Sequence, residues 1–476
     1  MNVFTVKHHV TKQEDKLSVG AKVGYGTGQA AQRIQLGSIN QMSTPIFNDI
    51  LGVDPRLIGI SLGAARIVDA LTDPLMGHIT DSTNSKYGRR RPWIAVSSLF
   101  CALTFAAIWL FPRGMSYGFY FGWFVVTTIL FFLALSIFSV PYSALGMELT
   151  PDIHERTSVM AYRTAMGTIG GLLVSSLYWI INLDCFEDMA HGMRYAGIGF
   201  SALVAVFIFI PALSAKEHPG IIRGRKRSRS QKNSLLASAK LTLSHKPFLM
   251  LMAATVIMIC GLNIVLAMSY YVAVYHVFDG VKNAATGFVL SVHGYACVLG
   301  SLSGIPTMTF ISRRIGKRKT LIAAMLTAMV SSLLKWVCYT PANPYLILIP
   351  GFITAFSMVS VWTTLQSMLP EIVDLDELKT HERREGMFSA IQSWTTKMGY
   401  SLTVIGAGFI LNASGFDATL ATQSASTVLQ LRLFYTLIPA AALLVGSLIM
   451  MCYPITEKHA LETRHKLDQR YLQIPD

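Results

Sequence analysis

Long segments with almost no charged residues recur from one end of this 476-residue chain to the other. A segment of about 18 residues or more is long enough for a helix to cross the hydrocarbon core of a bilayer, which is roughly 30 Å thick. Hydrophobic residues make up 52% of the chain and charged residues only 14%, against about 25% in a soluble domain. So few charges do not cover the surface of a soluble protein of this length. The sequence therefore predicts a polytopic, all-α membrane protein.

Twelve segments have the length and hydropathy of transmembrane helices. They span residues 21–43, 56–79, 93–112, 118–146, 158–181, 195–213, 246–276, 285–310, 319–339, 344–369, 387–411 and 432–453.

Basic residues are concentrated in the loops that follow even-numbered segments. The second and third segments are joined by TDSTNSKYGRRRP, the eighth and ninth by SRRIGKRK, and the sixth and seventh by a stretch containing RGRKRSRSQK. Because positively charged loops face the cytoplasm, this pattern accounts for most of the net charge of +14. It predicts a protein of the cell membrane with both termini in the cytoplasm. Arg223 to Lys232 also have the composition that binds anionic lipid headgroups.

The two halves of the chain resemble each other. Gly88 and Gly316 are 228 residues apart, and each precedes a pair of basic residues. Two copies of six helices with a basic linker between them are typical of a transporter whose site lies between the halves. The sequence therefore predicts the following divisions: an N-terminal segment 1–20, a six-helix bundle 21–213, a linker 214–245, a second six-helix bundle 246–453 and a tail 454–476.

Charged residues inside the second segment indicate a functional site, because charges within a bilayer are costly. Arg66, Asp69 and Asp73 are spaced at i, i+3 and i+7, which places them on one helical face. Two carboxylates one turn apart suit a monovalent cation or a proton, since the bound charge relieves their repulsion. A structural ion pair between Arg66 and Asp69 is the alternative, although it leaves Asp73 unexplained.

The first and fourth segments each carry a polar stripe. In the first, Gln29, Arg33 and Asn40 recur at helical spacing, and Arg33 either pairs with Asp69 or Asp73 or binds an anionic or hydroxyl-rich substrate. In the fourth, hydroxyl groups near one side are either ion ligands or ordinary interhelical contacts. These hydroxyl residues are Ser136, Ser139 and Ser143.

The second half carries polar residues in its tenth and eleventh segments. Lys397 lies well inside a segment, where packing alone does not explain a lysine. Trp362 offers a flat apolar face of the kind that a sugar ring contacts, although a tryptophan at such a position is often part of a core. Gln392 and Ser393 lie one turn or more before the lysine.

Five motifs in order resemble those of the glycoside–pentoside–hexuronide:cation symporter family of the major facilitator superfamily. They lie within about residues 20 to 455 and read KVGYGTG, ARIVDALTDPLMG, DSTNSKYGRRRPWI, VPYSALGMELTPDIHERTSVMAYR and LPEIVDLDELKTHERREGMFSAIQSWTTKMG.

The resemblance implies a sugar or glycoside carrier driven by Na⁺ or H⁺. Asp69 and Asp73 match the two cation-site carboxylates of the family, with Thr72 and Ser136 at neighbouring polar positions. The residues that match the sugar site and its border are Arg163, Trp362 and Lys397.

This chain departs from the melibiose carriers of that family at two positions. Those carriers hold galactoside hydroxyls with a carboxylate on the first helix and another on the fourth, where this chain has Arg33 and Ser139. With Arg163 and Lys397 these changes give a positively charged cavity, so the sequence predicts an anionic or substituted sugar such as a uronide or a sulfated saccharide. Animal lysophosphatidylcholine transporters are similar to the same family, so a lysolipid carrier is the main alternative.

A membrane-embedded enzyme is a remote alternative, because the chain has no metal-spaced set of His and Cys residues and no nucleophile with a base. We therefore expect a transporter that works by alternating access, without a cofactor or metal beyond the coupling ion, and without nucleic acid as a partner. We also expect it to act as a monomer.

Charged residues near the cytoplasmic ends of the helices are expected either to form a gate or to be part of a solvated surface. These residues are Asp81, Arg89, Arg90, Glu148, Arg156, Asp374 and Arg384.

Overall fold

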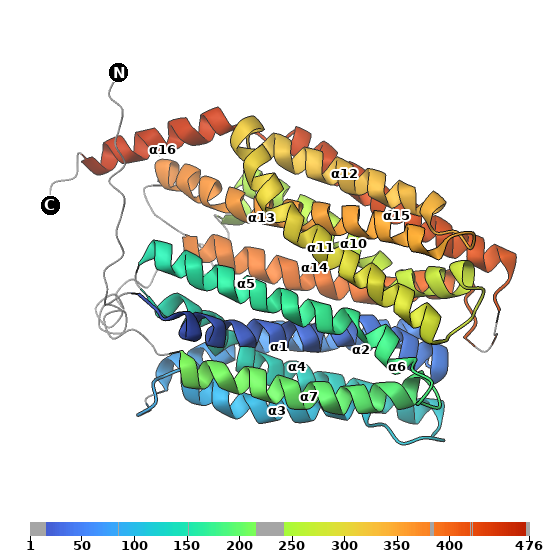
Figure 1. Cartoon of the computed structure of the whole chain (residues 1–476). Helices are drawn as coiled ribbons and strands as arrows, with labels where there is room; N and C mark the ends of the chain where they lie inside the picture. Colours follow the sequence, from blue (N-terminus) through green and yellow to red (C-terminus); the bar gives the residue numbers. More distant parts are fainter. Residues whose placement is uncertain are drawn as a thin grey trace.

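The computed structural model describes residues 16–83, 85–150, 152–215, 242–380, 385–418, 420 and 422–472, and these residues form an all-helical bundle (Figure 1). The long helices of the first half are α1 (Val19–Thr44), α2 (Pro55–Ser82), α3 (Arg91–Trp109), α4 (Tyr117–Glu148), α5 (Ile153–Ser175) and α7 (Met189–Ser214). Those of the second half are α10 (Lys246–Val272), α11 (Ala284–Ile315), α12 (Lys317–Cys338), α13 (Leu348–Thr380), α14 (Glu385–Ala413) and α15 (Ala425–Met451). The shorter elements are the π-helices η2 (Pro45–Ile50) and η3 (Ala273–Val277), the 3₁₀ turn η4 (Pro344–Ile347), α6 (Leu177–Ile181) and α16 (Glu457–Leu472).

These twelve long helices confirm the predicted fold of two six-helix bundles. Most of the predicted linker 214–245, including its basic centre, lies outside the described residues, as does most of the predicted N-terminal segment 1–20. The predicted tail 454–476 contains the helix α16, which packs against α13.

Nine of the helices in the described part of the chain are long and apolar enough to cross a membrane. The helices α1, α2 and α14 are not among these nine. They are the helices that carry Arg33, Asp69 and Lys397. Polar residues that lower the hydropathy of a helix are tolerated in a membrane where they face the protein interior.

Side-chain caps fix where several helices begin. The side chains of Ser18, Asp54, Ser116, Asp188 and Ser424 each accept a hydrogen bond from a backbone N–H in the first turn of the following helix. Such caps satisfy N–H groups that have no partner within the helix. The local sequence therefore sets the boundaries of α1, α2, α4, α7 and α15.

The internal repeat is visible in the backbone. Gly88 and Gly316 both have positive φ, at 101° and 82°, in the short loops that precede α3 and α12. Gly52 and Gly280, separated by the same interval, also have positive φ, at 70° and 81°. Glycine adopts this conformation readily because it has no Cβ. The π-helices η2 and η3 end the first helix of each half at equivalent positions, so the two halves are built alike.

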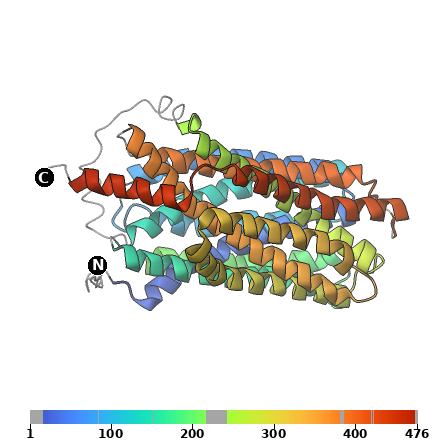
Figure 2. The same ribbon diagram turned by 90° about the horizontal axis from the view of Figure 1, so that it is seen from above.

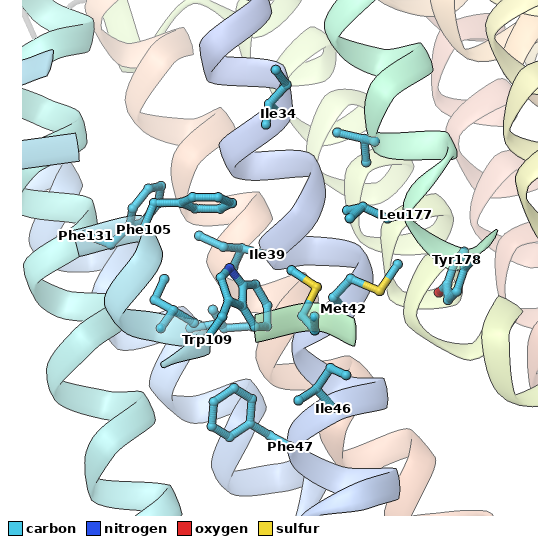
Figure 3. Close-up of a cluster of buried hydrophobic side chains, with 14 of the residues drawn as sticks. Ile34, Ile39, Met42, Ile46, Phe47, Phe105, Trp109, Phe131, Leu177 and Tyr178 are labelled. Atoms are coloured by element: carbon cyan, nitrogen blue, oxygen red, sulfur yellow. The ribbon is translucent and has the colours of Figure 1, made fainter. Parts of the chain in front are cut away.

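Each half is packed around buried apolar side chains. Figure 3 shows part of the core of the first half, where Ile39 and Phe47 from α1 and η2 meet Phe105 and Trp109 of α3. Phe47 and Phe124 form a tilted aromatic contact with ring centres 4.3 Å apart. The same cluster continues into the second half through residues such as Tyr271 and Tyr435, and a second cluster fills the rest of that half. The shared cluster therefore packs the two halves against each other.

We call the end of the bundle where α1 begins and α15 ends the terminal end, and the opposite end the distal end (Figures 1 and 2). Between the halves, α2 packs along α14, and α11 packs along α5 and α6. Several of these contacts lie near the distal end. A Cβ added to Gly408 would lie 2.2 Å from the Pro55 carbonyl oxygen, and one added to Gly287 would lie 2.4 Å from that of Tyr178. Glycines therefore let the two halves approach closely at the distal end.

Candidate functional site: a charge cluster between the halves

Three charged side chains from opposite halves meet near the middle of α2 and α14. Asp69 and Asp73 lie on one face of α2, and Lys397 reaches both from α14. The Lys397 Nζ lies 2.8 Å from Asp69 Oδ2 and also donates a hydrogen bond to Asp73 Oδ2. The side chain of Asp69 is only 11% exposed, and charges shielded from water interact strongly. Lys397 therefore links the second half to both carboxylates of the first.

Hydroxyl groups from two helices complete this cluster. Ser136 Oγ of α4 donates to Asp69 Oδ1 at 2.7 Å, and Thr72 Oγ1 lies 2.9 Å from Ser136 Oγ. The other carboxylate oxygen of Asp73, Oδ1, is buried and has no hydrogen-bond partner among the described residues. Buried polar atoms usually have a partner, and oxygen atoms of this kind are the ligands that hard cations prefer. The four residues predicted as the cation site thus lie together.

A second polar group lies where α1 faces α5. Arg163 Nε donates to Gln29 Oε1 at 2.7 Å, and its guanidinium carbon lies 5.1 Å from the centre of the Tyr142 ring. Arg33 follows Gln29 by one turn, and both side chains border Gly167 of α5. Arg33 is exposed and has no ion pair within 4.0 Å in the described part of the chain. The structure therefore pairs both aspartates with Lys397 and leaves the Arg33 guanidinium accessible.

Arg66 does not form the ion pair with Asp69 that was the alternative interpretation of the second segment. Its Nη2 donates instead to Asn40 Oδ1 of α1 at 3.2 Å. The guanidinium carbon lies 5.1 Å from the ring centre of Phe132 and 5.6 Å from that of Tyr400. Asp69 is engaged by Lys397 of the other half, a contact that helical spacing within α2 does not reveal.

The remaining residues predicted to bind substrate lie on three different helices. Ser139 and Ser143 are half-buried on α4. Trp362 is half-buried on α13 and packs against the core of the second half. On α14, Gln392 is buried and Ser393 is exposed.

The predicted gate residues that the structure describes include a compact group at the terminal end. Arg90 Nε lies 2.9 Å from Glu148 Oε2, and Arg89 Nη2 lies 2.8 Å from Glu148 Oε1. These ion pairs join the loop before α3 to the end of α4, within the first half. Asp374 is half-buried on α13. The side chains of Asp81 and Arg156, and all of Arg384, lie outside the described residues.

A further buried ion pair at the terminal end joins the start of α1 to α5. Lys22 Nζ lies 2.8 Å from Glu155 Oε1, which also accepts a hydrogen bond from the Leu17 N–H at 2.7 Å. Burial raises the pKa of Glu155, but the hydrogen bonds from Lys22 and Leu17 lower it, and the net pKa lies below the ordinary 4.5. Sequence reasoning did not select Lys22, since it lies before the apolar part of the first segment.

A buried carboxylate at the distal end was also missed by sequence reasoning. Asp49 lies in η2 with a fully buried side chain, and its Oδ2 is 2.6 Å from Lys282 Nζ. Tyr270 donates to Asp49 Oδ2 at 3.0 Å, and Tyr275 donates to Oδ1 at 2.5 Å. All three donors come from the second half. Asp49 follows an apolar segment and resembles a loop residue in sequence, so only the packing of the halves reveals its role.

Two bundles of six helices that meet at a shared charge cluster define a membrane carrier. Residues 24–457 match the family described as MFS/sugar transport protein. The chain belongs to this family and is a major facilitator symporter rather than an enzyme.

Curated relatives match the chain along nearly its whole length. An uncharacterized symporter of Bacillus subtilis, YjmB, is 24% identical and covers 96% of this chain and 97% of its own. The isoprimeverose transporter of Lactiplantibacillus pentosus is also 24% identical, with 94% of each chain covered. The sodium-dependent lysophosphatidylcholine symporter 1-B of Danio rerio is 24% identical as well, covering 97% of this chain and 91% of its own.

Solved structures show the same fold at lower sequence identity. A bacterial homologue of the human lysosomal transporter Spinster, in an inward-facing and unoccupied conformation, has a TM-score of 0.64 at 12% identity and covers 96% of this chain and 99% of its own. A D-xylose-proton symporter has a TM-score of 0.60 at 17% identity, covering 91% of this chain and 95% of its own. These similarities establish the major facilitator fold.

Proposed function

We propose that this protein is a cation-coupled symporter of a sugar or glycoside that carries a negative charge. The observation that supports this most directly is the contact of Lys397 with both Asp69 and Asp73 across the boundary between the halves. An ammonium group placed between two carboxylates occupies the position that a coupling cation would take. The cation is therefore a competitor of Lys397.

The residues around the carboxylates suit Na⁺ or a proton. Asp69, Asp73, Ser136 and Thr72 supply only oxygen atoms, and one oxygen of Asp73 is buried without a hydrogen bond in the described part of the chain. Na⁺ is a hard cation that takes such ligands, and a proton on Asp73 would neutralise the same charge. Binding of either ion would weaken the electrostatic attraction that holds the Lys397 ammonium between Asp69 and Asp73.

Coupling follows from this competition. Without the cation, Lys397 holds α14 against α2. With the cation bound, the Lys397 ammonium is released toward the space between the halves, where an anionic substrate can pair with it. The empty carrier and the fully loaded carrier then hold the same net charge in the interior, and every charged group of the cluster has a partner. Either ligand alone leaves the Lys397 ammonium or the two carboxylates buried without a partner, which costs free energy. Symport results because the empty and the fully loaded states reorient most readily.

The charges of the interior favour an anionic substrate. The helices α1, α2, α5 and α14 carry four basic residues near their centres, Arg33, Arg66, Arg163 and Lys397, and two acidic ones, Asp69 and Asp73. Arginine binds carboxylate and sulfate groups through paired N–H donors. We assign the accessible Arg33 and the Gln29–Arg163 pair to the substrate, with Ser139 and Ser143 as nearby hydroxyl partners and Trp362, Gln392 and Ser393 at its border.

The contacts between the halves support alternating access. At the distal end Asp49 binds three residues of the opposite half. The ion pairs described above at the terminal end, by contrast, lie within the first half. If the basic terminal end faces the cytoplasm of a cell membrane, the structure represents the state that is closed to the outside. The predicted gate charges at the terminal end are proposed to pair across the two halves when the inner side is closed.

A lysophospholipid carrier is a second candidate. The observation in its favour is the match to lysophosphatidylcholine symporters at the same identity as the match to the isoprimeverose transporter.

Thermal stabilisation of the purified protein distinguishes these substrates. The test compares phenyl β-D-glucuronide, a sulfated saccharide, a neutral glycoside and lysophosphatidylcholine, each with and without Na⁺ and at two pH values. We expect the anionic sugars to raise the melting temperature most, and more so with the coupling cation. Stabilisation by lysophosphatidylcholine alone would support the second candidate, and stabilisation by the neutral glycoside but not by the anionic sugars would contradict an anionic substrate.

A further inference from the structure

The helices α12 and α15 lie side by side in the second half (Figure 1), and both are long and apolar enough to cross a membrane. Near the distal end they are joined by two cation–aromatic pairs. The guanidinium carbon of Arg432 on α15 lies 4.2 Å from the ring centre of Trp336 on α12. Lys335 Nζ of α12 lies 4.4 Å from the ring centre of Tyr435 on α15. Each helix therefore contributes one cation to this junction.

The charges of this junction are not balanced by acidic residues. Arg432 and Lys335 have no ion pair within 4.0 Å in the described part of the chain. Arg432 Nη2 donates to the Trp336 carbonyl at 2.9 Å, while its Nη1 makes no hydrogen bond to a described residue. His276 of η3 interacts electrostatically with Arg432 and is itself a basic residue. The distal ends of these helices therefore present positive charge to a ligand.

The Arg432–Trp336 pair lies at the surface of the bundle. Trp336 is 38% exposed, and the side chain of Arg432 is partly exposed. On the same helix as Trp336, the apolar side chains of Val330, Leu333 and Val337 are also exposed. Their spacing places them on one helical face, and this face leads from Trp336 toward the middle of the membrane. An arginine and a tryptophan above an apolar strip match the layers of a lipid, which has a polar headgroup above its acyl chains.

We infer that Arg432 and Trp336 form a headgroup site for an anionic phospholipid in the leaflet at the distal end. The available N–H groups of Arg432 donate to phosphate oxygens, and the indole ring of Trp336 supports the guanidinium from one side. An acyl chain of the lipid lies along the apolar strip of α12.

The charges around the site select the headgroup. A choline or ethanolamine group carries a positive charge, and it would lie beside Arg432 and His276 without a carboxylate to offset their repulsion. A headgroup such as glycerol, which has no charge of its own, avoids this repulsion. The site therefore favours phosphatidylglycerol over phosphatidylcholine. The inference goes beyond the proposed function, because the lipid binds at the outer surface of the second half rather than between the halves.

The first half supplies a matched control for Arg432. Arg194 of α7 donates to the Phe111 carbonyl just after α3 at 2.7 Å, much as Arg432 of α15 donates to the Trp336 carbonyl near the end of α12. Both arginines thus tie the sixth helix of a half to the end of the third. This structural role is common to the two residues, whereas lipid binding is assigned to Arg432.

Native mass spectrometry of the purified, delipidated full-length protein tests the inference. Wild type and a variant are mixed in one sample and titrated with phosphatidylglycerol or with phosphatidylcholine of the same acyl chains. We expect wild type to bind phosphatidylglycerol more tightly. Arg432→Gln should weaken that binding about fivefold, the factor that corresponds to one basic residue near an anionic membrane surface, and should leave phosphatidylcholine binding within about twofold. Arg194→Gln should bind both lipids as wild type does, and Arg432→Lys should retain most of the preference because it keeps the charge.

Three results would overturn the inference. The first is equal binding of the two lipids by wild type. The second is an equal loss of phosphatidylglycerol in Arg432→Gln and Arg194→Gln, which would show a structural role alone. The third is displacement of the lipid by inorganic phosphate at the same concentration, which would assign Arg432 to a free anion. If Arg432→Gln does not fold, Trp336→Leu takes its place, and an unchanged preference for phosphatidylglycerol in that variant would also overturn the inference.

Discussion

Lys397 of α14 lies 2.8 Å from Asp69 of α2, so a cation of one half neutralises a carboxylate of the other. The same ammonium also binds Asp73. Removing either side of a buried ion pair leaves an uncompensated charge, which costs about 3–5 kcal/mol. The contact therefore makes the relative position of the two halves depend on what else binds the carboxylates.

Replacement of Lys397 by alanine should increase the affinity for the coupling cation. Without the competing ammonium, Asp69 and Asp73 are free to bind it, and we expect half-maximal stabilisation at a roughly tenfold lower Na⁺ concentration. Melting curves over a Na⁺ series, or over a pH series for a proton, measure this effect. Lys397→Arg is the control, because it keeps a cation at the site. A Lys397→Ala protein that no longer responds to any cation would contradict the competition.

Replacement of Asp49 by asparagine should open the distal end. The change removes the charge that Lys282, Tyr270 and Tyr275 share, and we expect the closed state to lose about 3 kcal/mol relative to the open state. Spin labels at Met115 and Leu420, which are exposed in distal loops of the two halves, report the separation.

The expected result of that experiment is a longer distance population in Asp49→Asn than in wild type. Glu187→Gln is its control, since Glu187 pairs with Arg113 at the exposed surface of one half, where ion pairs contribute little. An unchanged distance distribution in Asp49→Asn would show that Asp49 does not hold the halves together.

Replacement of Glu155 by glutamine should reduce stability in a pH-dependent way. The folded-state pKa of Glu155 is lowered below 4.5, so its contribution is present above the pKa of the unfolded chain and is lost as pH falls through the lower folded value. We expect Glu155→Gln to unfold about 1–2 kcal/mol more easily near pH 7. The melting temperatures of the two proteins should differ steadily above pH 4.5 and begin to converge only below it. A difference that grows toward low pH would contradict this prediction.

The sequence predicts the helices well because their causes are local. Hydropathy, glycine turns and N-cap residues such as Ser116 and Asp188 define where they begin and end. The spacing of Asp69 and Asp73 also places both on one face of α2 without knowledge of the fold. Local patterns therefore predict the helices and the two carboxylates of the proposed cation site.

Contacts between the halves could not be predicted in this way. Helical spacing suggests that Arg66 pairs with Asp69, yet Lys397 occupies that carboxylate from a helix more than 300 positions away. Asp49 lies outside a strongly apolar segment, and its tyrosine partners are far along the chain. These pairs form because segments far apart in the sequence pack together, and the periodicity of a single helix carries no information about that packing.

Gradient-driven uptake into proteoliposomes tests the central proposal most directly. Wild-type protein and Asp73→Asn are compared for accumulation of phenyl β-D-glucuronide under an imposed Na⁺ or proton gradient, and for exchange of the same compound without a gradient. We expect wild type to accumulate the glucuronide only with the cation gradient, and Asp73→Asn to exchange it but not accumulate it. Accumulation by Asp73→Asn at the wild-type level would contradict a coupling site at Asp69 and Asp73.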